Sequence, residues 1–422
     1  MAEPRSQAPP LPRALHLQQA EVEPFVDAAG EVAENHMVLN FGPQHPATHG
    51  TLRLVLELDG ERVIRAIPEI GFLHTGFEKL GEYRTWNHFV PLSDRMNYLS
   101  AMNNNVAYVG AVEELLGIEV PPRGQVIRMI MCELGRISDH IICCGLQGMD
   151  LGAFSVMLWS FIEREKVYDI FDVTSGGRLT TSYTRVGGLA YDIPQDFQAR
   201  VKTFMAKCAD VVEEIEKMLS RNRIFTDRTI GVGRLPRADA VSFGVTGPLA
   251  RASGVQWDVR RARPYLQYDK MDFDIPTLPD GDVFSRYKVR LEEMRQSLKI
   301  LRQLIDAIPP GPVNSLNHKV TLPDKMDVYT SMEELIHHFE LIMPGYGIQP
   351  PVGEIYHSQE SPNGELGFFL VSDGSGIPYR VRVRPPSFYN YQSIAKMLEN
   401  AMIADLVAVL SSLNVIAGEL DR

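Results

Sequence analysis

Two histidines lie close together in residues 42–50, which read Gly-Pro-Gln-His-Pro-Ala-Thr-His-Gly. His45 and His49 titrate near neutral pH, so they could donate protons or supply half of a metal site. The prolines and glycines of this segment exclude a regular helix or a central strand. The i, i+4 spacing therefore does not place both imidazoles on one helix face, as a helical metal site requires. A proton-donating site, half a metal site and a structural loop all remain possible interpretations.

A phenol, a carboxylate and four thiols are further candidates for chemistry. Tyr98, in Arg95-Met-Asn-Tyr-Leu99, would by default be a core aromatic residue near a helix start. Asp150 separates two hydrophobic helical segments, so it either caps the following helix or pairs with a buried cation. The cysteines show no C-x-x-C spacing and lie within helical patterns, which favours small core residues over a metal or cluster site: Cys132, Cys143, Cys144 and Cys208.

Four arginines gather around Trp257 and Tyr265, a pattern typical of a solvated face or an interface: Arg251, Arg260, Arg261 and Arg263. The chain contains neither G-x-G-x-x-G nor G-x-x-x-x-G-K-[ST], the glycine-rich patterns of dinucleotide and phosphate binding. It also lacks the G-x-S-x-G elbow of serine hydrolases. We therefore expect no nucleotide site and no serine nucleophile on this chain.

A small β region is predicted to hold the histidine segment in place. Leucines occupy every second position from Leu52 to Leu58, the turn signal Asp59-Gly60 follows, and a return strand begins at Val63. This pattern predicts a hairpin. With an edge strand at residues 38–41, the sheet would hold the histidine segment at both ends.

Helical patterns dominate the middle of the chain. From about residue 95 to residue 308, apolar residues recur at spacings of three and four, as in amphipathic helices. Residues 152–173 are apolar on several faces, as expected for a helix at the centre of a bundle. A second hairpin is predicted from 366–371 and 379–384, and a final helix from 391–413.

These patterns predict an α+β fold that is predominantly helical, a bundle flanked by small N-terminal and C-terminal antiparallel sheets. We expect a flexible arm followed by one domain, with these parts: arm 1–35, domain 36–422, β region 36–70, helical core 78–310, and C-terminal β region and helix 350–422. The arm is rich in proline, alanine and glutamate, a composition typical of unfolded segments.

The composition excludes several classes of function. The chain has 422 residues, 45% of them hydrophobic, and a net charge of −11. This charge disfavours a nucleic-acid surface and direct attachment to anionic lipid. No apolar run reaches the ~20 residues that cross a bilayer, and no secretory signal is expected. Sparse cysteines indicate a reducing compartment.

Taken together, the motifs resemble one family, the 49-kDa or D subunit of NADH–quinone oxidoreductase (respiratory complex I). The resemblance covers nearly all of the chain after residue 35. It rests on the histidine segment and on further ordered matches: Gly71-Phe-Leu-His-Thr-Gly-Phe-Glu-Lys79, Arg95-Met-Asn-Tyr-Leu99, Pro121-Pro-Arg123, Met149-Asp-Leu-Gly-Ala153, Arg251-Ala-Ser-Gly254, Gly364-Glu-Leu-Gly367, Ser372-Asp-Gly374, Pro378-Tyr-Arg-Val381 and Asp421-Arg422.

The resemblance implies a fold similar to the large subunit of [NiFe]-hydrogenases. Those enzymes bind their metal with two C-x-x-C pairs, which would fall at residues 95–100 and 413–418 of this chain. Neither segment contains cysteine, and a nickel–iron centre needs thiolate ligands. No metal is therefore expected here, and the resemblance places the headgroup of a quinone in the vacated site.

Roles for individual residues also follow from the resemblance. His49 and Tyr98 would bind the quinone and give the two protons that its reduction requires. Asp150 would partner His49 and stabilise its imidazolium form. His45 would support the loop, with direct quinone contact less favoured.

The resemblance further implies a place in an assembly. No cofactor is expected on this chain alone: electrons would come from a [4Fe–4S] cluster on the neighbouring B subunit, and NADH and FMN would bind to other subunits. The expected partners are subunits B, C, I and H of a proton-pumping complex, with the chain peripheral on the cytoplasmic side of a bacterial inner membrane. Two alternatives stay open: a homologous complex fed by ferredoxin or another donor, and a non-redox scaffold.

The chain departs from the family pattern at two positions. Asn414 stands near the C-terminus where an acidic residue is usual. Thr180 stands where family members commonly carry a histidine near the terminal cluster.

Threonine does not titrate near neutral pH, so it cannot couple cluster reduction to proton uptake as histidine could. We therefore expect the midpoint potential of the neighbouring cluster to change little with pH near neutrality. Redox titrations of the assembled complex at several pH values, followed by electron paramagnetic resonance, measure this dependence. A slope near one proton per electron would contradict the expectation.

Overall fold

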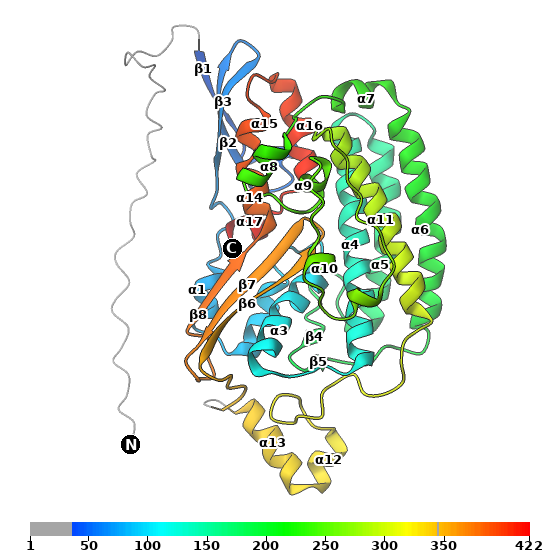
Figure 1. Ribbon diagram of the computed structural model, residues 1–422, viewed down its shortest axis with the longest axis vertical. Helices are drawn as coiled ribbons and strands as arrows, with labels where there is room; N and C mark the ends of the chain where they lie inside the picture. Colours follow the sequence, from blue (N-terminus) through cyan, green and yellow to red (C-terminus); the bar gives the residue numbers. More distant parts are fainter. Residues whose placement is uncertain (1–35, 344–345) are drawn as a thin grey trace, which may run out of the picture.

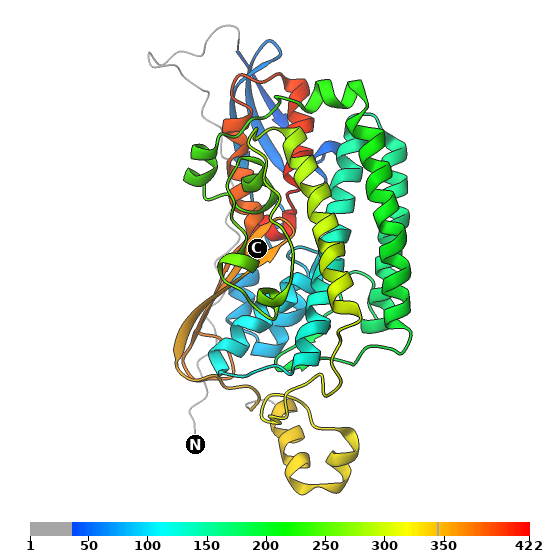
Figure 2. The ribbon, with the colours of Figure 1, turned by 45° about the vertical axis from the view of Figure 1, so that its right-hand side comes forward.

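The computed structural model describes residues 36–343 and 346–422, so the predicted arm at 1–35 lies outside the described residues. In this part of the chain, long helices pack side by side and two small sheets lie along one side of them (Figures 1 and 2). The predicted α+β, predominantly helical fold is confirmed.

The N-terminal sheet has the predicted strands. It contains β1 (His36–Phe41), β2 (Arg53–Asp59) and β3 (Arg62–Glu69), all antiparallel in the order β1-β2-β3. The alternating leucines of β2 are buried, because one face of the strand packs on the C-terminal helices. The histidine segment connects β1 to β2 and contains a single 3-10 turn, η1 (Pro46–Thr48).

Long helices form the bundle and its largest hydrophobic core. They are α3 (Ala101–Leu116), α4 (Pro122–Asp150), α5 (Phe154–Ser175), α6 (Phe197–Ser220) and α11 (Val283–Ile305). Pro122 occupies the first turn of α4, where its missing N–H is not needed. The side chain of Asp282 caps α11 by accepting from the backbone N–H of Ser285 at 2.8 Å.

The prediction that 152–173 is the central helix was wrong. The central helix is α4, which packs against α3, α5, α11 and the C-terminal helices. One side of α5 packs on α4 and α6, but four large apolar side chains on its other side are about half exposed: Phe154, Leu158, Trp159 and Ile162. We call these four residues the α5 apolar row. They resemble core residues in sequence, although the described residues 36–343 and 346–422 leave them about half exposed.

The C-terminal sheet contains the predicted hairpin and one more strand. Its strands are β6 (Gly353–Ser361), β7 (Gly364–Ser372) and β8 (Arg380–Arg384), antiparallel in the order β6-β7-β8. The sheet packs on α3. In β8, Val381 and Val383 are buried, and the intervening arginines point the other way, as predicted.

The predicted final helix at 391–413 is divided. The structure has α14 (Pro386–Gln392), α15 (Ile394–Met397) and α16 (Ile403–Leu413), followed by α17 (Ala417–Asp421). The break occurs because residues 400 and 401 pair with β3: Asn400 N–H donates to the carbonyl of Val63, whose own N–H donates to Ala401. Asn400 takes φ of +62°, which ends the helical path.

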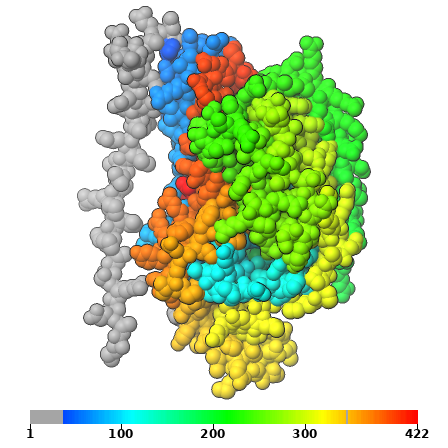
Figure 3. Space-filling view, in the orientation of Figure 1, coloured from blue at the N-terminus to red at the C-terminus, as the bar shows by residue number. Residues whose placement is uncertain are grey.

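Shorter elements complete the chain: α1 (Phe77–Gly81), η2 (Trp86–Phe89), α2 (Val90–Ser93), β4 (Thr184–Arg185), β5 (Gly188–Leu189), α7 (Arg223–Thr229), α8 (Arg237–Ser242), α9 (Gly247–Ala252), α10 (Val259–Ala262), η3 (Tyr268–Lys270), α12 (Lys325–Thr330) and α13 (Met332–Ile342). The predicted helical core is thus interrupted by long connections. The hairpin of α12 and α13 projects from the body (Figure 3), and neither helix contains a buried residue.

The prediction that four arginines form a solvated face or an interface is wrong for two of them, because these two are buried. Arg251 is 0% exposed, and its guanidinium lies 2.7 Å from Glu293 and 2.8 Å from Glu360. Arg260 is buried against Asp258 at 2.7 Å. Only Arg261 and Arg263 are exposed. This ion network joins α9, α10, α11 and β6, which are far apart in sequence.

Replacing Arg251 with leucine should leave two buried carboxylates without their cation. The free energy of unfolding is expected to fall by about 3–5 kcal/mol, measured by urea unfolding of the full chain. Arg200→Leu is the matched control, because it removes an exposed pair with Asp196 and should cost less than about 1 kcal/mol. Equal losses for both variants would contradict a stabilising role of the network.

Candidate active site

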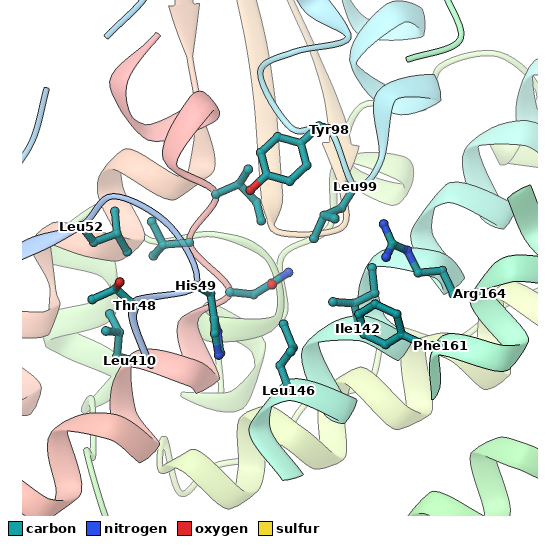
Figure 4. Close-up of a pocket in the computed structure, with 13 residues that line it drawn as sticks. Thr48, His49, Leu52, Tyr98, Leu99, Ile142, Leu146, Phe161, Arg164 and Leu410 are labelled. Atoms are coloured by element: carbon teal, nitrogen blue, oxygen red, sulfur yellow. The ribbon is translucent and has the colours of Figure 1, made fainter. Parts of the chain in front are cut away.

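A cavity of about 240 Å³ opens where five distant parts of the chain meet. The histidine segment, the loop before α3, helices α4 and α5, and the end of α16 with the following residues form its walls (Figure 4). Eight of the thirteen wall residues are apolar: Leu52, Leu99, Ile142, Leu146, Phe161, Leu410, Val415 and Ile416. The other five carry polar groups: Thr48, His49, Tyr98, Arg164 and Asn414. Such a wall suits a mainly apolar ligand that carries a few polar atoms.

The histidine loop is fixed by its own hydrogen bonds. The hydroxyl of Thr48 donates to the carbonyls of His45 at 2.6 Å and Gly50 at 2.7 Å. The ring of His45 packs on Phe41 at 4.1 Å between centroids, and its Nδ1 accepts from the backbone N–H of Ala47. His45 does not line the cavity. Its contacts are those of a residue that supports the loop.

His49 and Asp150, which are distant in sequence, are in contact. Nε2 of His49 lies 3.1 Å from one carboxylate oxygen of Asp150 and 3.3 Å from the other. Asp150 is the last residue of α4, and its side chain is only 6% exposed. The alternative that Asp150 caps the next helix is wrong, because Ala153 occupies the N-cap position of α5. The carboxylate therefore fixes the orientation of the imidazole at the cavity wall.

Tyr98 reaches the same cavity from the loop before α3, and its hydroxyl turns into the cavity (Figure 4). Burial raises the pKa of Tyr98 above its ordinary value, and the negative charge of Asp139 raises it further. The guanidinium of Arg164, on the α5 wall, acts in the opposite direction. The phenol is therefore neutral and able to donate a proton near neutral pH.

Residues 95–100 and 413–418, the two segments where the resemblance led us to look for cysteine pairs, both contribute to this cavity. A Cβ atom on Gly418 would lie 2.6 Å from the carbonyl oxygen of Arg95 and 2.9 Å from that of Met96. Only glycine permits this approach of the two backbones. Asn414, the departure noted in the sequence, lines the cavity, and its amide nitrogen donates to Asp139 on α4.

Sequence reasoning singled out His49, Tyr98 and Asp150, which the structure brings together. It missed the guanidinium of Arg164 and the carboxylate of Asp139. Arg164 lines the cavity and Asp139 is buried against the wall residue Asn414. Both lie within long helices, where no local motif distinguishes them from solvated polar residues. A weak signal existed for Asp139 alone, because a carboxylate in the strongly apolar stretch of α4 requires a partner.

The other candidates do not join this site. Thr180 is exposed in the loop that follows α5. All four cysteines are buried, and burial raises the thiol pKa of Cys132 to about 12 and of Cys143 to about 11. Among the described residues, no cluster of three or more His, Cys, Asp or Glu side chains could hold a metal ion. No helix in residues 36–343 or 346–422 has the length and apolar character to cross a membrane.

Comparison with known proteins gives consistent matches. Residues 150–422 match the family model described as respiratory-chain NADH dehydrogenase, 49 Kd subunit. The chain is 50% identical over 386 residues to the D subunit of NADH-quinone oxidoreductase from Geotalea uraniireducens, covering 92% of this chain and 98% of the relative. It is 49% identical to the corresponding D 1 subunit from Chloroherpeton thalassium, covering 92% and 88%. For the D subunit from Methylacidiphilum infernorum the identity is 48%, covering 94% of each chain.

The close approach at Gly418 provides a test of this architecture. Gly418→Ala should force the two segments apart and lower the free energy of unfolding by about 1–3 kcal/mol. Gly148→Ala is the matched control, since its new methyl group would meet side chains at an ordinary distance of 3.4 Å or more. Urea unfolding of both full-length variants measures the difference. If the two variants are equally stable, the segments do not depend on this contact.

Proposed function

This chain belongs to the family of the 49-kDa, or D, subunit of NADH-quinone oxidoreductase, and from that premise we propose that its cavity binds and protonates a quinone headgroup. One observation carries the proposal: a phenol, Tyr98, and a carboxylate-paired imidazole, His49, come from separate elements and line one largely apolar cavity. A quinone ring has a similar pattern, because it is flat and apolar with an oxygen at each end.

The two side chains match the protons that the reaction consumes. Reducing a quinone to a quinol adds two electrons and two protons, one proton on each ring oxygen. In the proposed step, the O–H bond of Tyr98 and an N–H bond of the His49 imidazolium break as the two new O–H bonds form. Tyr98 is left as phenolate and His49 as neutral imidazole, and both must regain a proton before the next turnover. In this step Asp150 keeps the His49 ring in place through its contact with Nε2.

We place the source of electrons on partner chains. Each of the described cysteines is a buried, free thiol. Such thiols do not fit a cluster site, which needs several thiolates together. The [4Fe–4S] cluster of the B subunit is the proposed donor, with NADH and FMN bound to other subunits. The substrate quinone is the one small molecule that this chain would contact itself.

The proposed assembly is the peripheral arm of a proton-pumping complex, with subunits B, C, I and H as partners. The α5 apolar row supports a protein partner at this side, because it lies on the same helix as the cavity residues Phe161 and Arg164. Contact with the membrane would come through partner subunits on the cytoplasmic side of a bacterial inner membrane.

Removing either proton donor should slow quinone reduction without preventing assembly. For Tyr98→Phe and for His49→Ala we expect kcat of NADH-driven quinone reduction to fall by roughly 10²-fold. Tyr83→Phe is the matched control, because Tyr83 is 69% exposed and outside the cavity; its activity should be unchanged.

The same experiment separates the proposal from the scaffold alternative. Assembly is checked by native gel, and electron entry is checked with an artificial acceptor that takes electrons before the quinone site. Full quinone reductase activity in an assembled Tyr98→Phe, His49→Ala double variant would favour a scaffold and overturn the proposed role.

A further inference from the structure

Asp139 is a buried carboxylate that the function proposed above does not use. It lies in α4 and is 0% exposed. One carboxylate oxygen accepts from the side-chain amide of Asn97 at 3.2 Å, and the other accepts from the side-chain amide of Asn414. In the part of the chain that the structure describes, Asp139 forms no ion pair with a lysine, arginine or histidine.

The cost of burying Asp139 differs from that of a residue that only fills space. Two amide N–H groups donate to the carboxylate oxygens, but neutral amides do not cancel a negative charge there. In a water-excluded interior, an uncancelled charge acts strongly on its neighbours. A fold that needed only to fill this space would use an apolar side chain at lower cost.

The two amides connect Asp139 to two segments that contribute residues to the cavity wall. Asn97 directly precedes Tyr98, and Asn414 is itself a wall residue. The carboxylate therefore joins the two segments whose backbones meet at Gly418. Because it is held at both oxygens, its position relative to the Tyr98 phenol is fixed.

We propose that Asp139 is a positioning residue for proton delivery: it joins Asn97 to Asn414, fixes the loop that carries Tyr98, and places a like charge beside the phenolate that forms at each turnover. This inference rests on the proposed function, since it assigns Asp139 a role through Tyr98. When the O–H bond of Tyr98 breaks and its proton moves to the reduced substrate, a phenolate forms near a fixed carboxylate. Repulsion between the two anions favours the return of a proton to the phenol before the next substrate is reduced.

The charges around Tyr98 and Asp139 agree with this role. Burial and then Asp139 raise the pKa of Tyr98, whereas Arg164 from α5 lowers it. Behind Asp139, burial raises the pKa of Glu419 on α17 to about 7, with Asp139 adding to the effect. His140, next to Asp139 on α4, contacts Glu293 at 2.8 Å. Arg164 is thus the cation that faces the phenol in opposition to Asp139.

The test places 3-nitrotyrosine at position 98 of the assembled complex, where the absorbance of the phenolate reports ionisation directly. With Asp139→Asn, the midpoint of this titration should move to lower pH by roughly one pH unit, because a like charge has been removed. Arg164→Gln should move it to higher pH. Asp139→Glu keeps the charge and should restore most of the original midpoint.

A purely structural role for Asp139 would not produce opposite movements in the two charge-removing variants. Should Asp139→Asn fail to assemble because its own amide meets two amide donors, Asp139→Ser removes the charge without adding a donor N–H₂. An unchanged midpoint in either assembled variant overturns the inference. Since activity of Tyr98→Phe decides the proposed function separately, each claim can fail without the other.

Discussion

The close approach of two backbones at Gly418 is the constraint on which the site depends. It places the loop that carries Tyr98 against the segment that carries Asn414, although more than 300 residues separate them. A side chain at position 418 would separate these walls. The N-terminal sheet then adds His49 from a third direction, and its loop is fixed by Thr48. The cavity therefore results from long-range packing, and its polar groups come from four separate parts of the chain.

Helix α4 connects this cavity to the rest of the molecule. It has a mainly apolar core face, yet it also carries Asp139, which contacts the wall residue Asn414, and Asp150, which contacts the wall residue His49. Such groups weaken a hydrophobic interior unless each has a partner. The partners come from elsewhere: asparagine amides for Asp139 and an imidazole for Asp150. In the same way, the buried guanidinium of Arg251 is paired with a carboxylate from another element.

Local patterns predicted what depends on local sequence. Strands with alternating leucines, the turn after Asp59 and the periodic helices were correct. Predictions from the sequence were wrong where contacts between distant segments decide the structure. The final helix is broken by pairing of Asn400 with β3, and Arg251 is buried by acids from other elements. His49 and Tyr98, which lie in recognisable motifs, line one cavity, but their roles stay a prediction; Arg164 and Asp139 lie in helices without such a motif.

The α5 apolar row has a thermodynamic consequence for assembly. Any partner that covers these four half-exposed side chains removes apolar surface from water, which gives association a negative heat-capacity change. The enthalpy of association then becomes more favourable as the temperature rises, while its entropy becomes less so. Cooling would consequently weaken this part of the interface, and added salt would weaken it far less than it weakens the charged contacts around it.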